Sequence, residues 1–361
     1  KSLMDFLSTH QKDDTTIQTL LIFNPDIVTK EGEDEKKLLY SFSNQTHYSD
    51  IANLGLFQTL IGFFSQFSKP LTTVTMEKTK TFLYSPEPSF WISYTISVDV
   101  PSLDSVGIQM LKFLCDAFIF LNGSFTKQYN TSSESFTYKL NKFFNSVMNS
   151  LNKELLASPG KLEGVQFSSM SKTSMISVIN FVNDINSRFK CVTDVSIFNS
   201  VQLLHSTLPT PMQSTLFTLF NMIRTGGMEF GSAFDSLRSA SDERKIILGV
   251  PEKRTKINDL NCPIFVDGVE KRWVVFEYKH FFFHFFLNMT KEESVNAFLV
   301  FLNQSMTTLL KTSYQDVFTN NSLVSSIKDS SVKTTYYYIN IPTQVKNGRS
   351  EERRVGKECR S

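Results

Sequence analysis

The chain has 361 residues, too many for one small hydrophobic core, and this length predicts two or three domains. Its 37 Lys and Arg residues nearly balance its 35 Asp and Glu residues, which argues against nucleic acid as a partner because phosphate binding needs clustered positive charge. The longest apolar runs, at 54–64 and 281–287, are shorter than the roughly 20 residues that span a bilayer, so we expect any membrane contact to be peripheral.

The first hundred residues alternate between strand and helix patterns. Short runs rich in β-branched and aromatic residues predict strands at 20–23, 38–42, 71–76, 79–84 and 90–98. Between the second and third strands, apolar residues recur at helical spacing over 51–65. Helical periodicity returns at 103–121 and 136–155, on either side of a polar stretch at 129–135 that predicts a loop. The pattern predicts an α+β domain, a five-stranded sheet with helices on its faces.

A similar unit begins again near residue 164. It predicts a short strand at 165–167, a helix at 175–189, strands within 191–204 and a helix at 212–223. Residues 225–259 are rich in glycine and charge and predict a long loop, whereas 272–287 are strongly strand-like and 295–309 predict a closing helix. One more strand pattern follows at 336–342.

Residues 349–361 resemble a translated sequencing-library adapter, and we expect them to be no part of the fold. They hold five of the basic and three of the acidic residues, so the rest of the chain carries 32 of each. Without them three cysteines remain, Cys115, Cys191 and Cys262, far apart and odd in number, as expected for reduced thiols in a cytosolic protein.

A family resemblance rests on the order and spacing of several short motifs, none of which is diagnostic alone. The motifs are Phe23-Asn24-Pro25, Glu31-Gly32, Gly55-Leu56, Ser68-Lys69-Pro70, Phe90-Trp91, Leu121-Asn122-Gly123-Ser124-Phe125, Lys142-Phe143-Phe144, Gly164-Val165-Gln166-Phe167 and Phe181-Val182-Asn183. In this pattern the chain resembles the longin-domain region of the CCZ-type (calcium-caffeine-zinc sensitivity) vacuolar fusion proteins. The likeness thins beyond Arg224.

The resemblance implies tandem longin domains, each a five-stranded, mostly antiparallel sheet with flanking helices. We expect a first longin domain at 17–157 and a second at 164–318, with a mobile loop at 225–259. Residues 334–346 would begin a truncated third longin domain, followed by the adapter-derived tail at 349–361.

For function, the resemblance implies one subunit of a heterodimeric guanine nucleotide exchange factor. Its partner would be a MON-type longin subunit, and its target the Rab GTPase of the late endosome and vacuole. Such a protein would be cytoplasmic and peripheral on late-endosomal, vacuolar or lysosomal membranes. Exchange is non-covalent, so we expect no catalytic residue and no cofactor. The alternatives are a longin subunit of another Rab exchange or ciliary effector complex, or a coat or adaptor module without exchange activity.

Two surfaces are candidates for binding. The resemblance implies that the helix at 51–65 contributes to dimerisation and GTPase docking, through Asn53, Phe57, Gln58 and Ile61, although from the residues alone it is an ordinary covering helix. In the loop at 225–259, Phe230, Phe234 and Leu237 would share one face of a helix and could contact an anionic membrane surface. A disordered insertion that touches nothing is the alternative.

The remaining candidates for chemistry are weak. His280 and His284 would share a face of a strand, but no acid or cysteine completes a ligand set, so we expect no metal. The segment Gly226-Gly227-Met228-Glu229-Phe230-Gly231 lacks the Lys-Ser/Thr of a phosphate-binding loop. No Gly-x-Ser-x-Gly, His-Glu-x-x-His or paired-cysteine motif occurs, so hydrolase and kinase chemistry have no support.

Overall fold

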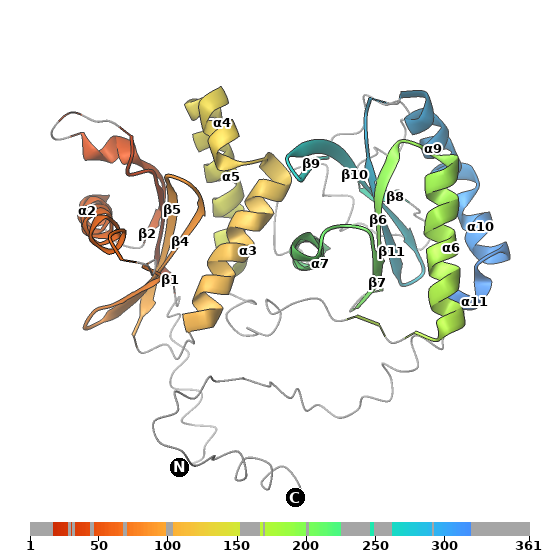
Figure 1. The fold of residues 1–361 in the computed structure, drawn as a ribbon, viewed down its shortest axis with the longest axis horizontal. Coiled ribbons are helices and arrows are strands. Elements are labelled where there is room, and N and C mark those ends of the chain that lie inside the picture. The colour runs from red at the N-terminus through yellow and green to blue at the C-terminus, as the bar shows by residue number, and fades with distance from the viewer. Residues whose placement is uncertain are drawn as a thin grey trace, which may run out of the picture. The chain divides into compact units, whose positions relative to one another are not determined.

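The computed structural model describes residues 17–27, 30, 33–43, 47–67, 71–98, 104–151, 167–168, 170–199, 202–224, 246–248, 262–290 and 292–318. These residues form two layered domains, each built on one antiparallel sheet (Figure 1). The predicted third domain, the tail and most of the loop at 225–259 lie outside the described residues.

The first sheet has the five strands that the sequence predicts. They are β1 (Ile17–Phe23), β2 (Leu38–Ser43), β3 (Thr73–Thr75), β4 (Thr79–Glu87) and β5 (Phe90–Ser97). Their order is β2-β1-β5-β4-β3 and every pairing is antiparallel. A short 3-10 helix, η1 (Asp34–Lys37), leads into β2. Because β1 and β5 are central, their side chains are buried on both faces of the sheet.

Helices cover both faces of this sheet. One face carries α2 (His47–Phe64), and the other carries α3 (Asp104–Asn122), α4 (Phe125–Thr131) and α5 (Ser133–Leu151). At Gly107 the backbone of α3 lies against the Phe82 ring of β4, where an added Cβ would come within 2.6 Å. Glycine therefore allows this helix to approach the sheet closely.

The loop predicted at 129–135 is largely helical. The helix α4 continues to Thr131, and Ser132 breaks the chain for one residue before α5 begins. The Ser132 hydroxyl accepts a hydrogen bond from the Ser135 backbone N–H at 3.2 Å. Ser and Thr favour turns and helix N-caps alike, so this polar run does not by itself distinguish a loop from two capped helices.

The second domain repeats the strand order of the first. Its strands are β6 (Val192–Asn199), β7 (Leu203–Ser206), β8 (Ile246–Leu248), β9 (Pro263–Val266), β10 (Val269–Tyr278) and β11 (Phe281–Leu287). The order β7-β6-β11-β10-β8 matches that of the first sheet position by position, and β9 pairs with β10 beside β8. The fold is therefore α+β with two similar domains, as predicted for tandem longin domains, except that the second sheet has a sixth strand, β9.

The second domain differs from the expectation at three predicted segments. The closing helix predicted at 295–309 is divided at Ser305 into α9 (Glu292–Gln304) and α10 (Met306–Thr312). Within 225–259, predicted as a loop, Ile246–Leu248 form β8. The strand predicted at 165–167 is reduced, among the described residues, to one parallel bridge between Phe167 and Leu203. A short isolated strand carries too little side-chain pattern to be assigned reliably from sequence.

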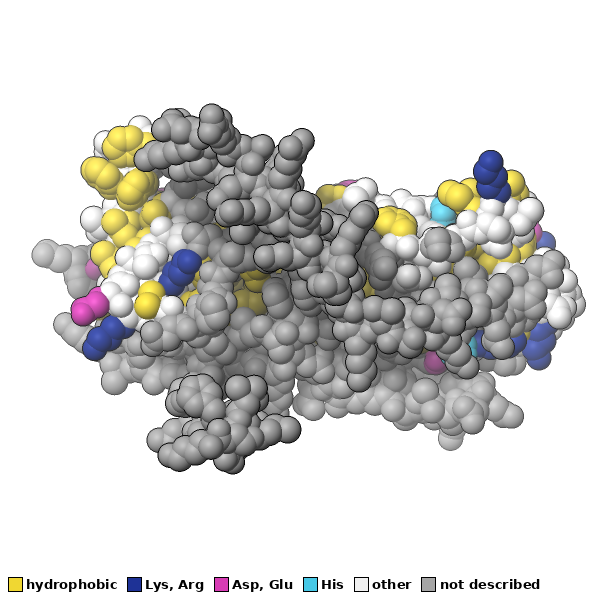
Figure 2. Space-filling view, turned by 90° about the horizontal axis from the view of Figure 1, so that it is seen from below, with side chains coloured by type: hydrophobic (Ala, Val, Ile, Leu, Met, Phe, Trp, Pro, Cys, Tyr) yellow, Lys and Arg dark blue, Asp and Glu magenta, His cyan; other side chains and the backbone are white. Residues whose placement is uncertain are grey.

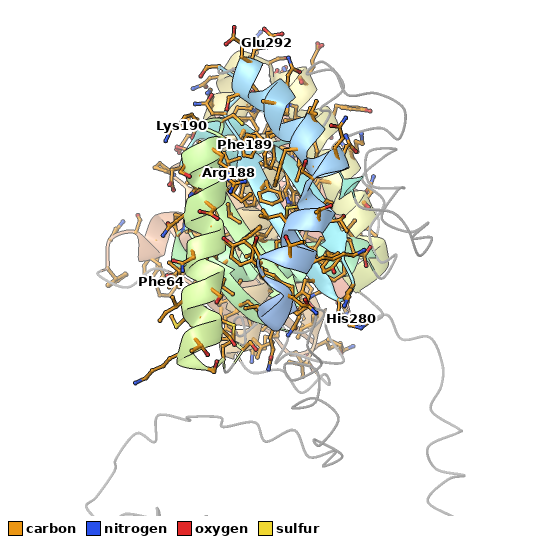
Figure 3. The ribbon with its side chains drawn as sticks, turned by 90° about the vertical axis from the view of Figure 1, so that its right-hand side faces the viewer. Phe64, Arg188, Phe189, Lys190, His280 and Glu292 are labelled. Carbon is orange, nitrogen blue, oxygen red and sulfur yellow. The ribbon has the colours of Figure 1, made fainter. Side chains whose placement is uncertain are left out.

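Helices again lie on both faces of the second sheet. One face carries α7 (Thr210–Arg224), and the other carries α6 (Lys172–Arg188), α9 (Glu292–Gln304), α10 (Met306–Thr312) and α11 (Gln315–Phe318). Figure 3 shows α6 and α9 side by side, where the Phe189 ring contacts the Phe298 ring at a centroid distance of 5.2 Å. The helix α6 precedes the first hairpin and has no counterpart among the described elements of the first domain.

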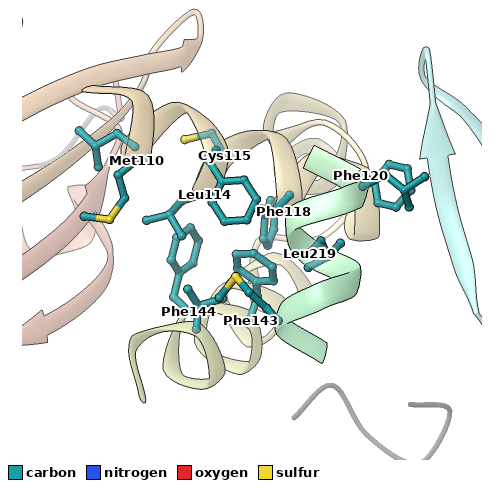
Figure 4. Close-up of a cluster of buried hydrophobic side chains, with 14 of the residues drawn as sticks. Met110, Leu114, Cys115, Phe118, Phe120, Phe143, Phe144 and Leu219 are labelled. Atoms are coloured by element: carbon teal, nitrogen blue, oxygen red, sulfur yellow. The ribbon is translucent and has the colours of Figure 1, made fainter. Parts of the chain in front are cut away.

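The two domains share one hydrophobic core. The helix α3 packs against α7, and its Phe120 ring meets the Trp273 and Phe286 rings of the second sheet at 5.8 and 6.4 Å (Figure 4). The helix α7 is therefore enclosed between its own sheet and the helices of the first domain. The cysteines Cys115, Cys191 and Cys262 are buried and unbridged.

Candidate functional site

The helix α2 is fixed to the first sheet by one polar and several apolar contacts. Near its start, the Ser41 hydroxyl of β2 donates a hydrogen bond to the Asp50 carboxylate at 2.6 Å, and Asp50 is almost fully buried. Further along, Leu54 and Phe57 pack against the sheet in a small cluster with Leu21, Phe23 and Leu83. These contacts define which side of the helix faces inward.

From Ile51 onward, the outward side of α2 is largely apolar and has no charged residue. Residues 51–67 include no Asp, Glu, Lys, Arg or His. Leu56, Phe63 and Phe67 are 38%, 54% and 56% exposed. The rings of Phe63 and Phe67 lie 5.3 Å apart, and both contact Phe64. In Figure 2, hydrophobic side chains gather at the left-hand end, where Figure 1 places α2.

Two glycines interrupt this outward face. Gly55 and Gly62 are exposed, and a Cβ added at either would meet no other atom within 4 Å. Their carbonyls accept hydrogen bonds from the Thr59 and Ser65 hydroxyls at 2.9 and 2.7 Å. A glycine inside a helix costs up to about 1 kcal/mol relative to alanine, and the described chain offers no packing reason for either one. Both therefore leave room for another backbone to approach α2 closely.

The four residues predicted for this site are not all on the outward face. Phe57 is 2% exposed and faces the sheet, and Ile61 packs partly against the same cluster. Asn53 and Gln58 are half-buried on the flanks of the helix, and the Gln58 Nε2 is buried without a hydrogen-bond partner. The exposed residues of the outward face instead include Leu56, Thr59 and Phe63. The signal for them in the sequence is the absence of charge on every side of the helix.

The other candidates do not form a site. His280 is exposed in the turn before β11, whereas His284 is fully buried and its Nδ1 accepts a hydrogen bond from Trp273 Nε1 at 3.1 Å. Figure 3 shows His280 at the opposite end of the domain from Glu292. Burial lowers the pKa of His284 to about 3. The described residues contain no group of three potential metal ligands.

The predicted membrane-contact residues Phe230, Phe234 and Leu237 lie outside the described residues, as does the glycine-rich segment at 226–231. Among the helices that are described, none alone has both the length and the apolar composition to cross a membrane. One bent pair, Val106–Asn122 with Phe125–Thr131, satisfies both conditions together, and much of it lies in the protein core.

Two comparisons with known proteins bear on this architecture. Residues 17–123 match the family model described as the first longin domain of INTU, CCZ1 and HPS4. Proteins named vacuolar fusion protein CCZ1 homolog are similar to the chain. The one from Danio rerio is 24% identical over 215 residues, which is 54% of this chain and 45% of the relative. The one from Nematostella vectensis is 27% identical over 208 residues, 52% of this chain and 45% of the relative.

The chain thus spans less than half the length of the curated relatives that it matches. The match at 17–123 covers all five strands of the first sheet together with α2 and α3. The outward face of α2 therefore lies within the matched domain. The resemblance to the CCZ-type proteins is confirmed, and residues 17–123 match the first longin domain found in INTU, CCZ1 and HPS4.

Proposed function

We propose that this chain acts in membrane fusion and vesicle-mediated transport as one subunit of a two-subunit guanine nucleotide exchange factor. Its partner would be a MON-type longin protein and its target the Rab GTPase of late endosomes and vacuoles. The names of the CCZ1 relatives support the vacuolar fusion role. The observation that carries a two-subunit arrangement is the uncharged outward face of α2.

The physical argument concerns desolvation. A monomeric soluble protein commonly places charged residues on the outer face of a surface helix, and an apolar helix is usually buried on all sides. The outer face of α2 has exposed Leu56 and Phe63 and two glycines that nothing in the described chain covers, and the turn after the helix adds exposed Phe67. An interface that removes these side chains from water would gain hydrophobic free energy without desolvating a charge on α2.

Nucleotide exchange of this kind requires no acid, base or nucleophile from the chain. The factor binds the nucleotide-free GTPase more tightly than the loaded form and so shifts the population toward release. In the proposed arrangement, α2 contacts the partner subunit and helps to form a composite surface for the GTPase. The chain would then act at the cytosolic surface of late endosomes, vacuoles or lysosomes, through protein contacts and a peripheral membrane contact.

Release of a fluorescent mant-nucleotide from a late-endosomal Rab tests the proposal. It would be measured with this chain alone, with a MON-type partner alone, and with the two together. We expect substantial release only with both, because the docking surface is shared. Full activity from this chain alone would contradict the two-subunit arrangement. Stable recovery with coat subunits instead of a MON-type protein would favour the adaptor alternative.

A matched pair of variants tests the role of α2 in the same assay. Leu56→Arg should change the unfolding free energy by less than about 0.5 kcal/mol, because the side chain is exposed. It should nevertheless weaken partner binding at least tenfold, since an unpaired charge would be buried in the interface. Val300→Arg on α9 is the control, because Val300 is an exposed apolar residue outside the first domain. Equal co-elution of both variants with the partner would exclude α2 from the interface.

A further inference from the structure

A cavity of about 280 Å³ lies where α3, the start of α7 and the turn between β9 and β10 meet. Its apolar walls include Phe120, Met212 and Phe265, and its polar groups include the carboxylates of Asp116 and Asp267. Elements of both longin domains line it. It is separate from the outward face of α2, and the proposed exchange function makes no use of it.

The two carboxylates differ in burial, because Asp116 is half-buried whereas Asp267 is exposed. Among the described residues, neither forms a hydrogen bond or an ion pair, although Lys112 lies one helical turn before Asp116 on α3 and also lines the cavity. The burial of Asp116 raises the pKa of its carboxyl, which the positive charge of Lys112 counteracts. Partial burial disfavours the charged form of the Asp116 carboxylate, and a cation bound beside it in the cavity would offset that cost.

The opposite wall is held by the backbone. Asp267 and Gly268 form a two-residue hairpin turn with positive φ angles of 50° and 76°, a geometry that Asp-Gly sequences favour. This turn places Asp267 at the edge of the cavity. The requirement of the hairpin accounts for Asp267, whereas nothing in the packing of α3 accounts for a half-buried Asp116.

The side chains that line the cavity favour one chemical class of ligand. Hard metal ions prefer sites rich in oxygen ligands, whereas the walls of this cavity are mainly aromatic and aliphatic. Aromatic faces and a thioether beside a carboxylate suit an organic cation, because the ring attracts the charge and the apolar walls cover the stem. We propose that the cavity binds a guanidinium or alkylammonium group carried on a short apolar stem. The Asp116 carboxylate would pair with the charge, and Phe120, Met212 and Phe265 would contact the stem.

The probe is n-butylguanidinium, and its neutral isostere n-butylurea is the control ligand. Binding to the full chain would be followed by NMR of methyl-labelled methionine, with the Met212 signal assigned from the Met212→Leu variant. We expect the Met212 signal to shift saturably with butylguanidinium and not with butylurea. Met76, exposed at the end of β3, should not respond to either. No shift at Met212, or an equal shift with butylurea, would overturn the proposal.

Variants of the two carboxylates test which of them contacts the positive charge of the ligand. Asp116→Asn should weaken butylguanidinium binding about tenfold, as expected for the loss of a charge-assisted hydrogen bond. Asp267→Asn tests the opposite wall with a residue that tolerates positive φ, so the proposal stays testable if the α3 variant does not fold. Unchanged affinity in both variants would contradict the assignment.

A blocked Gly-Arg-Gly peptide distinguishes the two sources of such a group. A shift of Met212 with the peptide as well as with butylguanidinium assigns the cavity to an arginine side chain of a bound protein. A shift with butylguanidinium alone assigns it to a small-molecule cation, and a shift with neither overturns the proposal.

Discussion

The two longin domains place one helix in equivalent positions, and its two copies differ in what covers them. In each domain the helix follows the first hairpin and packs on the face of the sheet opposite the later helices: α2 in the first domain and α7 in the second. The outer side of α7 is covered by α3, so that even Thr215 and Thr218 are buried. The outer side of α2 has no such cover among the described residues.

The sequences of the two helices nevertheless resemble each other in polarity. From Thr210 to Ile223, α7 has no charged residue, and α2 has none after Asp50. For α7 the reason is visible, because it is enclosed between its own sheet and the helices of the first domain. In α7 the lack of charge thus accompanies burial on both sides. In the function proposed above, the outer side of α2 is buried by the partner subunit.

The largest expected difference is in the unfolding free energy lost when an aromatic side chain at the outer side of each helix is truncated to alanine. The residue at the outer side of α7 is Phe120, contributed by α3, and the one at the outer side of α2 is Phe63. Phe120 of α3, which covers α7 and contacts Trp273, is 1% exposed, whereas Phe63 of α2 is 54% exposed. Phe120→Ala should lower the unfolding free energy by about 3 to 5 kcal/mol. Phe63→Ala should lower it by less than about 0.5 kcal/mol. Urea denaturation of the isolated chain measures both, and similar losses would mean that α2 is covered within the chain itself.

Acid should weaken the packing around α7. The His284 ring lies 4.5 Å from the Phe220 ring of α7, and burial lowers the pKa of His284 to about 3. The unfolded chain therefore binds this proton more tightly, with a pKa near 6.5, so the stability contributed by neutral His284 is complete above about pH 6.5. Below that pH it falls by about 1.4 kcal/mol per unit until about pH 3.

The measurement is the unfolding free energy at pH 7.0 and pH 5.5, for the parent chain and for His284→Gln. Glutamine keeps a hydrogen-bond acceptor for Trp273 and does not titrate, so its stability should depend less steeply on pH. Carboxylates contribute equally to both proteins and cancel in the difference. Identical slopes would show that His284 titrates normally and is not enclosed against α7.

Much of the fold could be predicted from the sequence because its elements have strong periodicity. All five strands of the first sheet and the helices that became α2, α3 and α5 were predicted within a few residues, since β-branched runs and apolar stripes mark them directly. The polar run at 129–135 was misassigned because serine and threonine cap helices as readily as they form loops. The three-residue strand β8 depends on its pairing with β10, which local pattern does not encode.

The candidate site was harder to predict, for a related reason. When a helix is apolar on all sides, helical spacing does not say which side faces inward, and the predicted residues therefore included Phe57, which packs on the sheet. The orientation follows from long-range contacts, such as the Ser41 hydrogen bond to Asp50. Likewise, the packing of α3 on α7 is between residues about a hundred positions apart in the sequence, and no local pattern predicts it.

The smallest expected effect concerns the glycines of α2. Replacing them tests whether they are needed for the folded chain itself or only for binding of the partner. An added Cβ at Gly55 or Gly62 meets nothing within 4 Å, so alanine should fit without strain. Each of Gly55→Ala and Gly62→Ala should raise the unfolding free energy by up to about 1 kcal/mol, because alanine has the higher helix propensity. For a chain of this size that is roughly 2 to 4 °C in melting temperature.

The same substitutions should weaken co-elution with the MON-type partner, because the added methyl groups would hold a closely packed backbone away from α2. Asn296→Ala on α9 is the control: it raises helix propensity at an exposed position outside the first domain and should leave partner binding unchanged. A lower melting temperature would mean that the folded chain itself needs the glycines. A higher melting temperature with undiminished partner binding would mean that nothing approaches this face closely, and α2 would then be an ordinary surface helix despite its lack of charge.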